Sequence, residues 1–183
     1  MPSAPPDGAS IGPARAAEMP LVRTLFREYA GWLNVDLRFQ KFEQELASLP
    51  GVYSPPEGEI LLARIGSAGA GFPPASPGQP GTAREPASSN EVAGCVALRR
   101  LTDTACEMKR LWVRPAHRGR GLGRQLVQAV MEHGRNAGYE QMVLDTLRSM
   151  VPAYRLYRAC GFAEIAPYYD NPLPDAVYLG RRL

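Results

Sequence analysis

The stretch from Lys109 to Arg124 combines three alternating glycines with a concentration of positive charge. It holds six of the 21 lysines and arginines of the chain. Gly119, Gly121 and Gly123 lack a Cβ atom, so this loop can take left-handed conformations that turn successive N–H groups toward one point. A helix that begins here adds free N–H groups and the positive end of its dipole. These residues predict a cradle for a phosphate-bearing small molecule.

Two common phosphate-binding motifs do not match this loop. A Walker loop requires Lys followed by Ser or Thr after its last glycine, and here Arg124 and Gln125 follow Gly123. A dinucleotide fingerprint requires G-x-G-x-x-G, but its last position falls on Arg124 or on Leu126. Both motifs are therefore excluded, and another phosphate-bearing ligand is needed.

Strands and helices alternate around this loop. The apolar spacing predicts a short strand near Ile11 and further strands at 59–65, 91–101, 105–113, 142–144 and 176–183. It predicts helices at 16–33, 39–49, 121–137 and 151–159. The strand–helix–strand unit around the glycines implies a right-handed parallel crossover in a mixed sheet. The loop is thus expected at the end of a strand, where a helix begins.

The length of 183 residues suits one domain with a substantial core. We expect residues 1–10 to form a disordered tail and residues 11–183 to form a single domain. Between residues 66 and 90, ten of 25 positions are Gly or Pro, which predicts a disordered insertion between two strands.

Several classes of protein are disfavoured by the composition. The cysteines Cys95, Cys106 and Cys160 have no disulfide or zinc spacing, so we expect buried thiols and no metal. No apolar run approaches the length that a bilayer requires, and no signal peptide is evident, which predicts a cytoplasmic protein without a membrane partner. The net charge of +3 is small and the basic residues are clustered, which favours a small anion over nucleic acid.

Two segments together resemble one family. Arg118-x-x-Gly121-x-Gly123 resembles R/Q-x-x-G-x-G/A, the acyl-CoA-binding signature of the GNAT (Gcn5-related) N-acetyltransferases. The segment from Ala153 to Phe162 looks like the family's A-x-x-L-Y-x-x-x-G-F. The resemblance covers residues 91–183. It implies an α/β (α+β) fold with a mixed, mostly antiparallel central sheet, flanking helices and a parallel crossover at the acyl-CoA loop.

The resemblance also implies acetyl-CoA as co-substrate. Backbone groups at the end of a strand and in the glycine loop would hold its pantetheine arm and pyrophosphate: Leu111, Trp112, Val113, Arg118, Gly119, Arg120, Gly121, Leu122, Gly123 and Arg124. Many members carry Asn three residues before the alanine of the second motif, where this chain has Met150. Ser149, the residue before it, is a candidate substitute.

Acetyl transfer to an amine needs a neutral amine, a stabilised oxyanion and a protonated leaving thiolate. By resemblance, Tyr157 faces the thioester sulfur and donates that proton, and the N–H of Val113 polarises the thioester carbonyl. Glu107 stands where some members place a glutamate that acts as base through water. Asp145 and His117 are two further candidates for the base.

The acceptor is not identified by these residues. In this family its site is formed by the first two helices and the last hairpin, which here offer Tyr29, Trp32, Phe39, Phe42 and residues 168–171. Together with Glu28, Asp36 or Asp170 they would suit a cationic amine beside an apolar group. We expect an amine on a small molecule or a protein, direct transfer in a ternary complex, and a monomer or homodimer. The alternative is a non-catalytic acyl-CoA sensor on the same fold.

Overall fold

The computed structural model describes residues 9–35, 41–66 and 91–183. Strands are β1 (Ala9–Pro13), β2 (Glu59–Ile65), β3 (Glu91–Arg100), β4 (Ala105–Val113), β5 (Gln141–Leu147), β6 (Ala163–Glu164) and β7 (Ala176–Arg182). The α-helices are α1 (Met19–Leu33), α2 (Phe42–Ser48), α3 (Leu122–Asn136) and α4 (Val151–Ala159). Short 3-10 turns lie at Ala16–Glu18, Gly51–Tyr53 and Pro115–His117.

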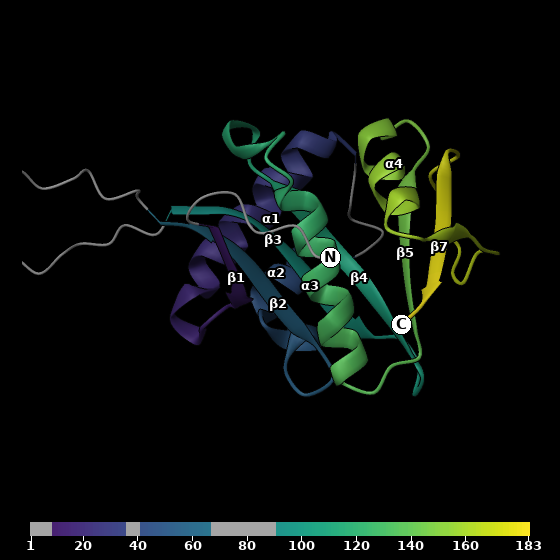
Figure 1. The fold of residues 1–183 in the computed structure, drawn as a ribbon, viewed down its shortest axis with the longest axis horizontal. Coiled ribbons are helices and arrows are strands. Elements are labelled where there is room, and N and C mark those ends of the chain that lie inside the picture. Colours follow the sequence, from purple (N-terminus) through teal and green to yellow (C-terminus); the bar gives the residue numbers. More distant parts are fainter. Residues whose placement is uncertain (1–8, 36–40, 67–90) are drawn as a thin grey trace, which may run out of the picture.

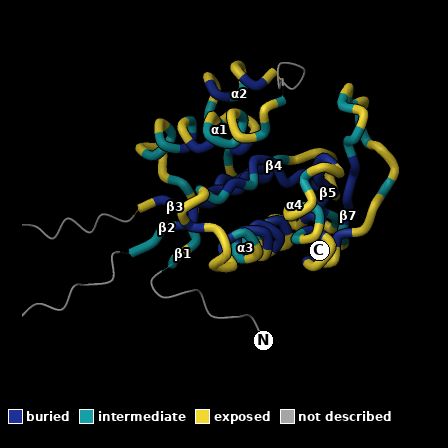
Figure 2. The backbone as a smooth tube through the Cα atoms, turned by 90° about the horizontal axis from the view of Figure 1, so that it is seen from above, coloured by how far each residue is buried: buried dark blue, intermediate teal, exposed yellow. Residues whose placement is uncertain are grey.

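The strands form one sheet in the order β1-β2-β3-β4-β5-β7-β6. Neighbouring strands are antiparallel except for β4 and β5, which are parallel and joined through α3. Helices α1 and α2 cover one face of the sheet, and α3 and α4 cover the other (Figures 1 and 2). The predicted mixed, mostly antiparallel sheet with one parallel crossover is confirmed.

Each face of the sheet carries its own apolar core. Val22, Leu25 and Phe26 lie on one face of helix α1, at positions i, i+3 and i+4. This face packs against the buried side chains of β2 and β3. Helix α3 buries Leu126, Val127, Val130 and Met131 against the opposite face. Burying these stripes is the main source of helix stability, because short isolated helices are marginal in water.

Strands β4 and β5 separate soon after they begin. Their ladder pairs only Ala105–Glu107 with Gln141–Val143. Strand β4 continues to Val113 with β3 alone as its described partner, while β5 continues beside β7. The sheet therefore opens into a wedge between these two strands, and its backbone edges become available to a ligand.

A β-bulge interrupts β4 inside this wedge. Ala97 pairs with Lys109 and Cys95 pairs with Trp112, so two residues of β4 stand opposite one residue of β3. Arg110 takes a left-handed conformation there, with φ of 57°. A Cβ at Gly94 would lie 2.4 Å from the Trp112 carbonyl oxygen, so the close approach of β3 to β4 requires glycine.

Most elements lie where the apolar spacing predicts them. The second strand, the strand at 105–113 and the helix at 151–159 have the predicted bounds. The first strand begins at Ala9, so the last two residues of the predicted tail pair with β2. The two-residue strand β6 was not predicted. The predicted insertion at 66–90 lies, apart from Gly66, outside the described residues. No helix in the described ranges is long and apolar enough to cross a membrane.

Candidate active site

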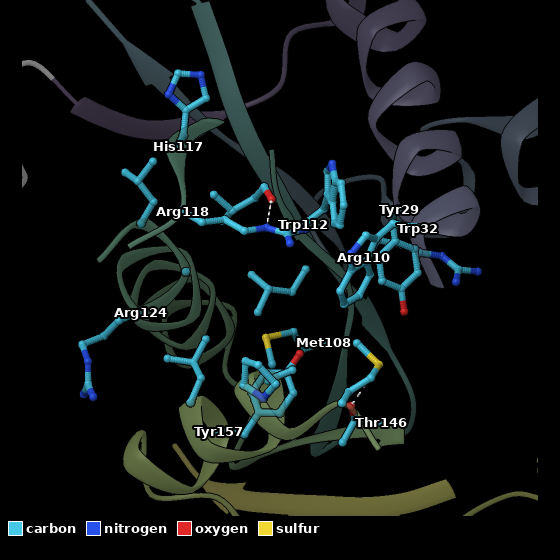
Figure 3. A pocket seen from close by; sticks show the side chains of 18 of the residues that line it. Tyr29, Trp32, Met108, Arg110, Trp112, His117, Arg118, Arg124, Thr146 and Tyr157 are labelled. Atoms are coloured by element: carbon cyan, nitrogen blue, oxygen red, sulfur yellow. Dashed lines mark hydrogen bonds between the residues drawn. The ribbon is translucent and has the colours of Figure 1, made fainter. Parts of the chain in front are cut away.

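A cavity of about 500 Å³ occupies the wedge between β4 and β5. The glycine loop and the start of α3 border it on one side, and α4 borders it on another (Figure 3). Tyr29 and Trp32 reach it from α1 on the opposite face of the sheet. The cavity therefore reaches both faces of the sheet.

The glycine loop keeps space open at the edge of this cavity. Gly119 and Gly121 have φ of 77° and 76°, and a Cβ at either would meet no atom within 4 Å. Gly123 is different, because it lies inside α3 and a Cβ there would be 3.2 Å from the Leu156 side chain. The left-handed conformations that the loop was expected to allow thus occur at Gly119 and Gly121, whereas the small size of Gly123 serves helix packing.

Helix α3 begins at this loop without a side-chain cap. Gly121 is its N-cap residue, and its first turn contains no acidic side chain. The free N–H groups of that turn and the positive end of the helix dipole meet at the loop. This arrangement can bind a phosphate group.

Only half of the six predicted cations remain available to an anion. Ion pairs hold Lys109 with Asp145, Arg110 with Glu45, and Arg114 with Glu28. No carboxylate of a described residue lies within ion-pair distance of the other three, Arg118, Arg120 and Arg124. Arg118 and Arg124 line the cavity. Arg120 is exposed outside its lining.

The backbone at the end of β4 faces the wedge. Arg114 donates its N–H to the Ala93 carbonyl of β3 at 2.9 Å. Because successive residues of a strand direct their backbone groups to alternate sides, those of Val113 point away from β3. The side chain of Arg118 confirms this, since its Nε donates to the Val113 carbonyl at 2.9 Å (Figure 3). Leu111, Trp112 and Val113 all line the cavity.

Tyr157 enters the cavity from α4. Its side chain is buried, and its ring packs edge-on against Phe162 at 6.1 Å between centroids. Burial raises the pKa of Tyr157 well above its usual value of 10. The phenol therefore keeps its proton at neutral pH and can donate it to a basic group in the cavity. The second motif thus brings Tyr157 to the same cavity as the glycine loop.

The two candidate carboxylates occupy different environments. Glu107 has no exposed surface, and it accepts hydrogen bonds from Arg99 at 2.6 Å and Tyr168 at 2.8 Å. It is not part of the cavity lining, whereas Asp145 is. Glu107, a base candidate from the sequence, therefore has no surface facing the cavity, because Arg99 and Tyr168 enclose its carboxylate.

Asp145 lies where the wedge begins. It accepts hydrogen bonds from Lys109 at 3.0 Å, Tyr169 at 2.9 Å and Asn171 at 3.3 Å. Burial acts to raise the pKa of Asp145, but the Lys109 ammonium and the Tyr169 hydroxyl outweigh it and lower the pKa below its usual value. Asp145 is therefore ionised at neutral pH. The role of Lys109 in holding it was missed, because its partner lies 36 residues away.

Several other residues predicted for the site lie away from Tyr157. Ser149 is exposed, and its hydroxyl donates to Asp175 at 2.6 Å, while Met150 lines the cavity. His117 stands at the far side of the glycine loop from Tyr157, with Nε2 3.1 Å from Glu91 (Figure 3). Phe42 is buried in the α1–α2 core, and Phe39 and Asp36 lie outside the described residues.

Comparison with known proteins identifies the class to which this fold and site belong. The sequence model of the Acetyltransferase (GNAT) family matches residues 77–162. An uncharacterised N-acetyltransferase of Schizosaccharomyces pombe is 39% identical over 158 residues, which cover 86% of this chain and 83% of that protein. The chain therefore belongs to the GNAT family, and it is an acetyl-CoA-dependent acyltransferase.

Solved structures show the same fold. A GNAT-family acetyltransferase from Staphylococcus aureus superposes with a TM-score of 0.70 at 16% identity, covering 95% of this chain and 98% of its own. A GNAT-family acetyltransferase from Elizabethkingia anophelis, solved with acetyl-CoA bound, gives 0.63 at 22% identity, covering 97% and 100%.

Proposed function

We propose that this protein transfers the acetyl group of acetyl-CoA directly to a primary amine within a ternary complex. The observation that carries the proposal is that Tyr157, Val113 and the glycine loop border one cavity. This cavity also reaches Tyr29 on the other face of the sheet, so donor and acceptor can enter from opposite sides. Direct transfer needs no covalent enzyme intermediate, and the three cysteines are all buried.

In this proposal the pantetheine arm lies along the free edge of β4. The Val113 N–H polarises the thioester carbonyl, and the residues from Arg118 to Arg124 hold the phosphates. Backbone donors suit this task because they are already oriented when the tetrahedral oxyanion forms. The open space over Gly119 and Gly121 supports the assignment, since a side chain there would fill the phosphate position.

The amine attacks the thioester carbonyl carbon, and the carbon–sulfur bond then breaks. Tyr157 gives its phenolic proton to the departing thiolate and regains a proton from solvent. The position of Tyr157 in the cavity lining supports this role. Burial keeps the phenol protonated, so its proton is available when the thiolate leaves.

The proton released by the amine needs an acceptor. Of the two carboxylates considered, Asp145 lines the cavity and is ionised, so we assign the proton to it. Glu107 then acts as a positioning residue. It lies 3.4 Å from Lys109, and Lys109 in turn holds Asp145. A base that works through water on Glu107 would first require Tyr168 to move.

An acceptor screen tests the proposal. The full chain is incubated with acetyl-CoA and a panel of small amines, amino acids, polyamines and peptides, and free thiol is measured. Thiol release that depends on an amine, with a matching acetylated product, supports the proposal. Acetyl-CoA binding raises the melting temperature for an enzyme and for a sensor alike. A shift without any acetylated product would favour a non-catalytic acyl-CoA sensor.

A further inference from the structure

The side chain of Arg118 crosses from the glycine loop to the opposite wall of the cavity. Its guanidinium carbon lies 4.9 Å from the ring centre of Trp32 and 4.7 Å from that of Trp112. The two indoles are themselves in contact, with centroids 5.4 Å apart. A cation held over two aromatic faces is stabilised by both. Figure 3 shows this arrangement, with the Arg118 bond to the Val113 carbonyl drawn as a dashed line.

This position coincides with the path of the pantetheine arm in the proposed function. The Val113 carbonyl is on the free edge of β4, and Arg118 Nε already donates to it at 2.9 Å. A pantetheine amide that ran along this edge would donate to the same carbonyl. Arg118 also has no carboxylate partner among the described residues, so its contacts here are to two rings and one backbone oxygen.

We infer that Arg118 acts as a latch across the acetyl-CoA slot, and that the pantetheine arm displaces it from Val113 and the two tryptophans. The inference rests on the proposed function, because it uses the β4 edge as the pantetheine site. Displacement frees the guanidinium to turn toward the phosphates at its own loop. Arg118 is thus a positioning residue that exchanges one partner for another when the donor binds.

The latch also joins the donor slot to the acceptor side. Trp32 belongs to α1, which covers the opposite face of the sheet from α3, and its side chain is 48% exposed. While Arg118 remains on Trp32, the loop and α1 are held together across the cavity. Release by the donor removes this contact between the glycine loop and α1.

The chain offers a direct spectroscopic report of the latch. It contains two tryptophans, Trp32 and Trp112, and both contact Arg118. Tryptophan emission of the full chain is recorded during titration with pantetheine, which has no phosphate or adenine, and with 3′,5′-ADP, which has no pantetheine arm. We expect pantetheine to shift the emission maximum and 3′,5′-ADP to leave it unchanged.

Two variants separate the latch from direct contact with the ligand. Trp32→Ala removes one aromatic face, so pantetheine should bind about two- to fivefold more tightly, the range expected from one exposed cation–π contact. Arg118→Gln should also tighten pantetheine binding. Arg135→Gln is the matched control, because Arg135 is exposed at the far end of α3 and its loss changes the net charge equally.

Each outcome decides the inference. Tighter pantetheine binding by Trp32→Ala and Arg118→Gln, but not by Arg135→Gln, supports the latch. Unchanged or weaker binding by Trp32→Ala overturns it, as does an emission maximum that pantetheine does not move. If neither acetyl-CoA nor pantetheine raises the melting temperature of the wild-type chain, the donor slot of the proposed function itself fails. If pantetheine binds the wild-type chain but binds Trp32→Ala and Arg118→Gln no more tightly, the latch is overturned and the donor slot stands.

Discussion

Arg110 of β4 and Glu45 of α2 form a buried ion pair that fastens the helix to the bulge. Arg110 donates from Nε to Oε1 at 2.9 Å and from Nη2 to Oε2 at 2.6 Å. Phe42 lies under the same guanidinium at 5.0 Å. The pair joins residues 65 positions apart in the chain, on the wall that the proposed acceptor would meet.

We expect Glu45→Gln to lower the free energy of unfolding by about 3 kcal/mol, because it leaves a buried guanidinium without its counter-charge. Glu43→Gln on the same helix is the control. Glu43 pairs with Arg27, and their side chains are 74% and 58% exposed. The free energy of unfolding should therefore change by less than about 0.5 kcal/mol. Urea unfolding measures both, and equal losses would contradict a special role for the Arg110 pair.

Tyr157→Phe should reduce kcat by about a hundredfold or more, since the leaving thiolate then lacks its proton donor. Acetyl-CoA affinity should be largely retained, because the ring still packs against Phe162. Tyr154→Phe on the same helix is the matched control, as its hydroxyl bonds to exposed Glu164 outside the cavity. If the chemical step limits the rate and Tyr157→Phe leaves kcat unchanged, Tyr157 is not the acid.

Gly121→Ala should lower the free energy of unfolding by about 1 to 2 kcal/mol, because alanine is strained at a φ of 76°. It should also weaken acetyl-CoA binding, since the new methyl group enters the open space above the loop. Gly31→Ala is the counterpart in α1, where a Cβ likewise meets no atom within 4 Å but φ is helical. That variant should gain about 0.5 to 1 kcal/mol and bind acetyl-CoA normally.

The Glu18 carboxylate makes stability depend on acid pH. Hydrogen bonds from Arg15 foremost, and from Arg64, lower the pKa of Glu18 from 4.5 to about 2 in the folded chain. A lowered pKa means that the stabilisation is complete above about pH 4.5 and is lost as pH falls toward 2. Glu18→Gln should therefore destabilise the protein near neutral pH and become equal to wild type near pH 2. Urea unfolding across this range tests it, and a constant difference would contradict the assignment.

The local patterns of the sequence determined most of the elements and placed Tyr157 and the glycine loop on them. Apolar spacing along 151–159 depends on residues within one helix turn of each other, so the helix carrying Tyr157 could be located without tertiary information. The left-handed turn at Gly121 is likewise local, since it depends on the missing Cβ at that residue. The combination of the two motifs predicts where acyl-CoA binds.

Only the tertiary structure decided which of the basic residues between Lys109 and Arg124 are paired with carboxylates. Strict alternation along β4 would place Arg110 on the face covered by α3, but the bulge inserts one residue and turns it toward α2. The carboxylates that accept hydrogen bonds from Lys109, Arg110 and Arg114 lie 36 to 86 residues away along the chain and pair with these charges. Burial of Glu107 is decided in the same way, by Arg99 and Tyr168 from other elements. Residue type and spacing carry no record of such long-range contacts, because only folding brings these side chains together.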